Sequence, residues 1–221
     1  MTSPASPRKQ VGLGRALGGC AFVGATLFAV LLAAGFLLSG AMTLFWTRLD
    51  QRRFPWGYTG SGRPTLVGTW TGTLVTGGGT RFGLLVDLRM APAVVLSARG
   101  RMRVRSDSDS KLQGEARLCT PRGEVQRFTV GGDTEDDRRA SRFHLVLLPV
   151  EDLPRDGLTP SHLRGRWDGG DALAFEADVH QREGSASITR SDDPDTGRPG
   201  RVEMHRGDEA EFGAACAGLR R

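Results

Sequence analysis

The stretch LVGTWTGTLVTGGGTRFGLLVDLRM, residues 66–90, decides the fold, because its apolar residues recur at every second position on both sides of a glycine-rich turn. Before the turn, Leu66, Trp70 and Leu74 share one face with glycines, while threonines occupy the other. After the turn the repeating positions are Phe82, Leu84, Val86, Leu88 and Met90. A period of two is typical of an antiparallel strand with one face on a core and one in water. Glycines between two such strands indicate a hairpin.

The same alternation continues downstream in short segments separated by turn residues. A second clear hairpin joins residues 163–167 to residues 173–179 through Asp168-Gly169-Gly170-Asp171. Alternating segments between the two hairpins cover residues 94–104, 112–118, 128–130 and 143–147. Apart from a short turn near residues 208–216, this part of the sequence has no helical stripe of useful length. About eight or nine short strands at even spacing predict an all-β antiparallel domain, either a meandering barrel or a sandwich.

Gly68-x-Trp70, at the start of the first strand, is similar to the start of lipocalin-like and avidin-like barrels. The similarity covers only this tripeptide, and it assigns no family. A barrel of eight strands is wide enough to hold one small apolar ligand, although side chains more often fill it. The aromatic residues that would line such a cavity are Trp70, Phe82, Trp167 and Phe175.

Upstream of the strands, no charged residue stands between Arg15 and Arg48, and the intervening residues 16–47 are mostly apolar. This run of about 32 residues exceeds the roughly 20 that cross a bilayer as a helix. It predicts a single transmembrane helix with its core at about residues 18–42, because lipid offers the backbone no hydrogen-bond partners outside a helix. Small residues on one face would allow close packing on another membrane helix, at Ala21, Ala25, Ala29 and Ala33.

A cleaved signal peptide is the alternative interpretation of the apolar run. The small residues Ser39-Gly40-Ala41 would suit a cleavage site, so that the mature chain would begin at Met42. The run is longer than the core of a signal peptide, and Phe45-Trp46 lies where an interfacial aromatic belt is expected. Both features favour an uncleaved anchor.

These signals divide the chain into four parts. A short basic arm covers residues 1–15, the transmembrane helix residues 16–47, a linker rich in Pro, Gly and aromatic residues 48–65, and the β-domain residues 66–221. The favoured location of the linker's aromatic residues is the level of the lipid headgroups, and the alternative is that they dock on the β-domain; they are Phe54, Trp56 and Tyr58.

The net charge of +5 is confined to the flanks of the apolar run. The sequence past Arg53 contains 24 of the 30 basic residues and 24 of the 25 acidic residues, so the β-domain is formally neutral. A basic excess at the flanks of a membrane helix suits anionic lipid headgroups. Because the β-domain itself is neutral, the high isoelectric point is no evidence for nucleic-acid binding. The flanking residues are Arg8, Lys9, Arg15, Arg48, Arg52 and Arg53, against Asp50.

The equal basic flanks leave the orientation to weaker signals. The N-terminal arm is short, and a long domain can be translocated largely regardless of its charge. Cys119 and Cys216 give the β-domain an even cysteine count, which suits an oxidising compartment. We therefore predict a disulfide between them and a domain outside the cytoplasm, which means the periplasmic side of the inner membrane if the source is bacterial.

Arg99, Arg101, Arg103 and Arg105 alternate with small or apolar residues. On one continuous strand, all four guanidinium groups would share the outer face about 7 Å apart. Such a surface would bind lipid headgroups, phosphate-bearing glycans or an acidic partner. The alternative is a solvated face that Glu115 partly neutralises from the next strand.

The second hairpin carries charged residues on its outer face. Face-preserving register pairs Arg164 with Glu176 and His162 with Asp178, with His180 further along. We interpret this as a ladder of cross-strand ion pairs and not as a divalent-metal site, because the spacing fits no known metal motif. Ser161 and His162 point to opposite faces of a regular strand, which is unfavourable for a nucleophile and its base.

No sequence motif of a hydrolase, nucleotide-binding or redox site is present. We expect no catalytic residue and no cofactor. The sequence favours a membrane-anchored, extracytoplasmic binding or assembly module of an envelope complex. The alternatives are a carrier of a small apolar ligand inside the barrel and, less favoured, an anchored hydrolase of unrecognised type.

Overall fold

The computed structural model describes residues 14–59, 64–96, 102–106, 109–151, 157–183, 186–188 and 193–219. The chain forms two compact units, divided between Phe45 and Trp46. Helix α1, Gly14–Arg53, contains all of the described first unit and contributes its last turns to the second. Its segment Phe28–Arg53 is long and apolar enough to cross a membrane by length and composition. The predicted N-terminal helix is therefore confirmed as a helix.

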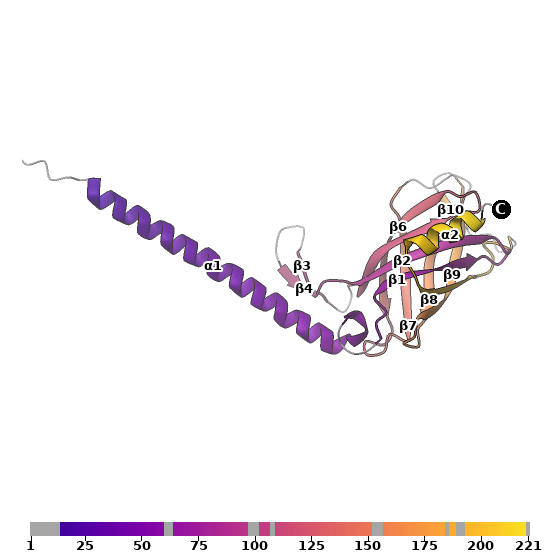
Figure 1. Cartoon of the computed structure of the whole chain (residues 1–221), viewed down its shortest axis with the longest axis horizontal. Coiled ribbons are helices and arrows are strands. Elements are labelled where there is room, and N and C mark those ends of the chain that lie inside the picture. The colour runs from indigo at the N-terminus through magenta and orange to yellow at the C-terminus, as the bar shows by residue number, and fades with distance from the viewer. Residues whose placement is uncertain are drawn as a thin grey trace, which may run out of the picture. The chain divides into compact units, whose positions relative to one another are not determined.

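The second unit is a closed antiparallel barrel (Figure 1). Eight of the nine strands in its sheet close on themselves, because β8 also pairs with β9 and leaves only β10 at the edge. The prediction of an all-β meander is confirmed, and closure distinguishes a barrel from a sandwich. In chain order the barrel strands are β1 (Gly68–Val75), β2 (Arg81–Met90), β5 (Leu112–Cys119), β6 (Val125–Thr134), β7 (Arg142–Pro149), β8 (Leu158–Arg166), β9 (Ala172–Glu183) and β11 (Gly200–Arg206).

Short elements lie outside the closed sheet. The 3₁₀ helix η1 (Pro55–Gly57) precedes the barrel, and β10 (Ala186–Ile188) pairs only with β9. Two more strands, β3 (Val94–Leu96) and β4 (Met102–Val104), pair only with each other. The prediction of one alternating strand over residues 94–104 is therefore wrong. A hairpin in face-preserving register keeps the same period of two as a single strand, so the pattern alone does not show the reversal.

The barrel interior is packed with large apolar side chains. Trp70 and Leu163 have no exposed surface, and Phe128 keeps 1%. Gly165 allows two rings to approach, because a Cβ there would lie 2.5 Å from Phe143 and 2.8 Å from Phe175. Those rings meet edge to face with their centroids 5.1 Å apart, a favoured aromatic geometry.

Arg206 joins the last barrel strand to the chain that enters the first. Its guanidinium lies 4.0 Å from the centroid of the Trp70 ring, within the range of a cation–π interaction. It also donates to the carbonyl oxygen of Val67 at 2.7 Å and to that of Thr65. The indole of Trp70 donates to the carbonyl oxygen of Leu66 at 2.9 Å. These contacts fix the seam at which the two ends of the sheet meet.

Helix α2 (Glu209–Leu219) packs on the outside of the barrel, against β2 and β1. A second, small apolar cluster forms there from Leu85, Cys119, Phe212 and Cys216. Cys119 and Cys216 lie at disulfide-bonding distance, with their Cα atoms 5.7 Å apart. The predicted pairing is consistent with this position, and the bond ties the C-terminal helix to β5.

Substituting Cys216 by Ser tests the contribution of this bond. Cross-linking residues 97 apart in the sequence removes chain entropy from the unfolded state, and the model of that effect gives about 4 to 5 kcal/mol. We expect Cys216→Ser to lower the free energy of unfolding by about 2 to 5 kcal/mol, measured by chemical denaturation under oxidising conditions. Adding a reductant should lower the stability of the wild type by a similar amount and leave the variant unchanged. Equal sensitivity of both proteins to reductant would contradict the bond.

Candidate functional site

The aromatic residues after α1 are part of the barrel core. Phe54 and Trp56 are each only 2% exposed and belong to the main apolar cluster. The structure therefore agrees with the alternative, docking on the β-domain, and not with the favoured location at the lipid headgroups. The physical reason is that these rings pack in one cluster with the apolar side chains of the barrel core, so burial in protein replaces burial at the membrane interface.

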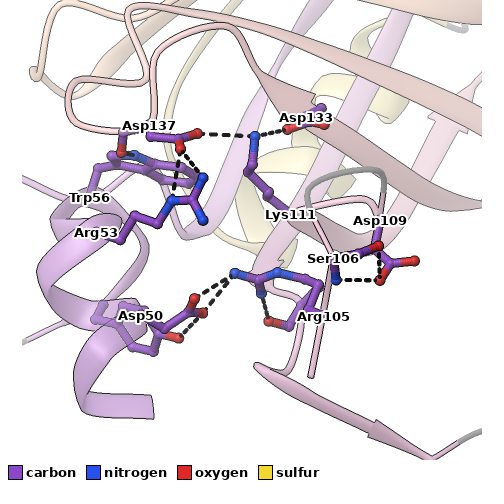
Figure 2. Close-up of polar contacts among 11 residues, drawn as sticks. Asp50, Arg53, Trp56, Arg105, Ser106, Asp109, Lys111, Asp133 and Asp137 are labelled. Carbon is purple, nitrogen blue, oxygen red and sulfur yellow. Dashed lines mark hydrogen bonds and ion pairs between the residues drawn. The ribbon is translucent and has the colours of Figure 1, made fainter. Parts of the chain in front are cut away.

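A buried ion pair joins the last turns of α1 to the chain after β4 (Figure 2). The guanidinium of Arg105 donates to both carboxylate oxygens of Asp50, at 2.9 and 2.7 Å. The Arg105 side chain is 5% exposed and the Asp50 side chain 14%. The Tyr58 hydroxyl also donates to Asp50, at 2.9 Å. Burial and this contact with a carboxylate raise the pKa of Tyr58, so it remains a neutral donor.

A second network surrounds Asp137, in the loop between β6 and β7 (Figure 2). Its carboxylate accepts from Lys111 at 3.0 Å and from Arg53 at 2.9 Å, and its carbonyl oxygen accepts from the indole of Trp56 at 2.7 Å. Lys111 also pairs with Asp133 at 2.8 Å. Burial opposes the charge of Lys111, but its hydrogen bonds to the two carboxylates outweigh this and raise its pKa.

Phe54 lies among the cations of both networks. Its ring centroid is 5.2 Å from the Arg53 guanidinium, 5.3 Å from that of Arg105 and 5.7 Å from the Lys111 ammonium. All three distances fall within the range of cation–π attraction. The end of α1 is thus docked to the barrel by ion pairs and aromatic contacts together.

The predicted row of four arginines is divided by these contacts. Arg105 is buried against Asp50, and Arg103 pairs with Asp109 at 2.9 Å. Both guanidinium groups are therefore neutralised within the chain. Arg99 and Arg101 lie outside the described residues. Arg103 and Arg105 therefore do not offer free guanidinium groups, and the surface formed by all four arginines stays a prediction, because its other two members are not described.

The four aromatic residues predicted to line a cavity do point into the barrel, but they are packed. Trp70 has no exposed surface, and Phe82, Trp167 and Phe175 keep 4, 5 and 4%. A cavity large enough for a ligand would leave its lining residues accessible. Within the described residues, these four side chains therefore leave almost no accessible lining inside the barrel.

The outer face of the β8–β9 hairpin has the predicted register. His162 lies opposite Asp178, and Arg164 lies opposite Glu176. The ion pair, however, runs diagonally, because Arg164 donates to Asp178 at 2.6 Å. His180 lies further along the same strand, opposite Thr159. The described residues hold no group of three or more His, Cys, Asp or Glu side chains suited to a metal ion.

His144 of β7 joins this face, which the sequence pattern did not reveal. Its Nε2 lies 3.0 Å from Nδ1 of His162, and the two ring planes differ by only 6°. Since the centroids are 5.1 Å apart, the rings meet edge to edge and one nitrogen donates to the other. Burial, followed by the charges of His162 and Arg164, lowers the pKa of His144.

A register shift changes the expectation for Ser161. The pairing of β8 with β9 shifts between Pro160 and His162, and the Ser161 hydroxyl comes within 2.7 Å of His180 Nε2. This is hydrogen-bond distance for a nucleophile and a base. The three hollows described below are lined by neither residue.

Two adjoining hollows form a trough on the outer face of the barrel, over β8, β9 and β11. Their volumes are about 810 and 920 Å³, and both are lined by Arg166, Ala174 and Glu203. One row of cross-strand neighbours crosses the trough, in the order Arg142, Arg166, Ala174, Glu203 and Thr73. The small Ala174 forms the floor, and the long charged side chains on either side form the walls.

The trough was not predicted from the sequence. Its one signal is the presence of Ala172 and Ala174 at outward positions where neighbouring strands carry Arg, Glu and His. The charges that line its first hollow nearly balance. They are Arg142, Arg164, Arg166 and Arg201 against Glu135, Glu176 and Glu203.

Comparison of the chain with protein-family models, curated proteins and solved structures gives no match. The function therefore has to be inferred from the residues and their geometry.

Asp50→Asn tests the buried ion pair, because it keeps the side-chain shape and removes the charge opposite Arg105. Leaving one member of a buried pair without its partner costs about 3 to 5 kcal/mol. We expect the melting temperature of the detergent-solubilised full chain to fall by about 10 °C. The matched control is Glu135→Gln, which breaks an exposed pair with Arg142 and should change stability by less than about 1 kcal/mol. Equal melting of the two variants would show that the buried pair does not hold the junction.

His144→Gln tests the imidazole pair through pH. Because the pKa of His144 is lowered in the folded state, its contribution is present above the unfolded value of about 6.5 and is lost as the pH falls below it. We expect the variant to lose less stability than the wild type between about pH 7.5 and 5.5. His205→Gln, on β11, controls for the loss of a histidine. A pH dependence that is the same in all three proteins would rule out the pair as its source.

Proposed function

We propose that this protein is a single-pass membrane protein whose barrel lies outside the cytoplasm and acts as a non-catalytic binding or assembly module. The observation that carries the proposal is the contrast between a packed barrel interior and a trough on the barrel's outer face. A partner would be bound along the outside of β8, β9 and β11. No interior site is needed for this role.

The chemistry of the trough favours a polypeptide partner. A floor of small residues accepts a main chain or a small side chain, and walls of both signs suit a segment that itself carries mixed charge. A strongly anionic polymer would meet the glutamates of the walls and be repelled. Arg166 and Arg201 have no ion-pair partner among the described residues, so they remain available for a carboxylate of the partner.

Two features support the location. The segment Phe28–Arg53 of α1, with 26 residues and a mean hydropathy of 2.1, is long and apolar enough to span a bilayer. A cysteine pair at bonding distance persists as a disulfide only in an oxidising compartment, outside the cytoplasm. Ala29 and Ala33 are exposed on α1, as a face for a second membrane helix requires, whereas the side chains of Ala21 and Ala25 lie outside the described part.

A carrier of a small apolar ligand is the alternative function. The burial of Trp70, Phe82, Trp167 and Phe175 gives it no accessible lining in the described structure. A bound ligand would require these rings to separate. The Ser161–His180 contact is the observation that a hydrolase would use.

Filling the trough tests the binding function. We expect Ala174→Trp to abolish co-purification of the partner from native membranes, because a bulky ring would occupy the floor between Arg166 and Glu203. A photoreactive amino acid at position 174 should form one discrete cross-linked species in the wild-type background.

The matched control is Thr129→Trp, with the same photoreactive residue at position 129, on the exposed outer face of β6. It should retain the partner and give no discrete cross-link. Retention of every co-purifying protein by Ala174→Trp, with unchanged melting, would contradict the assignment of the trough as the binding site.

A further inference from the structure

A third hollow lies at the base of the barrel, beside the residues that follow α1. Its volume is about 270 Å³, and its floor and walls include Trp56, Trp167, Pro55 and Pro64. The indole nitrogens are already satisfied, because Trp56 donates to Asp137 and Trp167 donates to the carbonyl oxygen of Gly170 at 2.8 Å. The two rings are 2% and 5% exposed, so they form a nearly closed floor without an unpaired donor, and the apolar side chains more open to solvent there are Pro55 and Pro64.

Two adjacent arginines, Arg138 and Arg139, give the rim of this hollow a positive charge. Both are exposed, and neither guanidinium forms an ion pair among the described residues, although the backbone N–H of Arg138 donates to the Asp136 carboxylate at 2.9 Å. One acidic side chain, Asp168, also lines the hollow, but its carboxylate accepts from the backbone N–H of Gly170 at 3.0 Å. The rim retains a net positive charge, which suits an anion.

The loop that carries the two arginines is held in place by the junction. Asp137, immediately before them, is fixed by Lys111, Arg53 and Trp56 (Figure 2). Immediately after them, Ala140 has a φ of 51° and donates its N–H to the carbonyl oxygen of Asp136 at 2.9 Å. Arg138 and Arg139 are thus presented from a loop that is anchored on both sides, so little ordering is needed when a ligand binds.

The hollow also lies close to the end of the apolar run along the chain. Thr47 ends that run and Pro55 lines the hollow, and at 1.5 Å per helical residue the segment from Thr47 to Arg53 is only about 9 Å long. The polar headgroup layer begins at the end of the apolar run and is several ångströms deep. Tryptophan and arginine are the side chains that gather in this layer.

We propose that this hollow binds the headgroup of an anionic phospholipid of the same membrane. The phosphate is held by Arg138 and Arg139, while the glycerol and the start of the acyl chains lie on Pro55 and Pro64, above the floor formed by the two tryptophans. This inference rests on the proposed membrane anchoring. It adds a lipid ligand to the barrel at a place other than the trough.

The test uses the full chain in lipid nanodiscs made of equimolar phosphatidylcholine and phosphatidylglycerol. After gentle detergent extraction, native mass spectrometry counts the lipids that remain bound. Each arginine near an anionic surface contributes about fivefold in affinity, so we expect phosphatidylglycerol to be retained at least about tenfold over phosphatidylcholine. Arg138→Ser/Arg139→Ser should reduce this preference to less than about threefold.

The matched control is Arg81→Ser/Arg122→Ser, which removes two exposed arginines from the turns at the opposite end of the barrel. It should retain the preference of the wild type. Equal lipid preference in wild type and Arg138→Ser/Arg139→Ser, with the protein inserted in the bilayer, overturns the lipid site alone. Failure of the full chain to insert overturns both this site and the anchoring. Displacement of the lipid by soluble glycerol phosphate at similar concentration would assign the hollow to a free phosphate ester and overturn the lipid assignment.

Discussion

A buried arginine requires a carboxylate, and in this protein the carboxylate comes from the helix that precedes the barrel. Arg105 is almost inaccessible, and both carboxylate oxygens of Asp50, in the last turns of α1, accept hydrogen bonds from its guanidinium. A charge taken out of water without such a partner costs several kcal/mol. The docking of the helix end, the burial of Phe54 and the position of the β6–β7 loop all depend on satisfying this and the neighbouring charges.

The need to pair these charges brings the end of α1 and the residues after it into the barrel fold. Residues 48–65 have the composition of a linker, yet Phe54 and Trp56 belong to the core and Asp50 and Arg53 to ion pairs. The barrel therefore begins structurally before its first strand. The anchored loop at Asp137 and the hollow beside it exist because the helix end is docked there.

Sequence patterns predicted the features that depend on residues close together in the chain. The period of two predicted the barrel strands, and face-preserving register predicted His162 opposite Asp178 and Arg164 opposite Glu176. The even cysteine count predicted Cys119 with Cys216. The contacts that the sequence did not predict join residues that are far apart in the chain. No pattern near Arg105 shows that Asp50 will neutralise it, and no pattern near His144 shows that it will meet His162. The trough likewise arises only when Ala174 is placed between strands that carry long side chains.

The proposed binding role is based on a barrel whose interior is packed and whose outer surface has a trough and a hollow. A barrel with Trp70 and Leu163 fully buried gives rigidity and no interior chamber. Its outer surface has a charged trough on one side and an arginine-rimmed hollow at the base. Rigid scaffolds with such surfaces hold partners in fixed positions, which is what an assembly module at a membrane must do.

The most direct test of this account compares two soluble fragments, one beginning at Trp46 and one at Phe54, both ending at Arg221. The first contains the whole second unit, and the second lacks Asp50 and Arg53. The account predicts that the shorter fragment melts about 10 °C lower, because Arg105 and Asp137 lose their partners from α1. It also predicts that Arg105→Met restores part of that loss in the shorter fragment. Equal melting temperatures would contradict the claim that the end of the helix is part of the barrel fold.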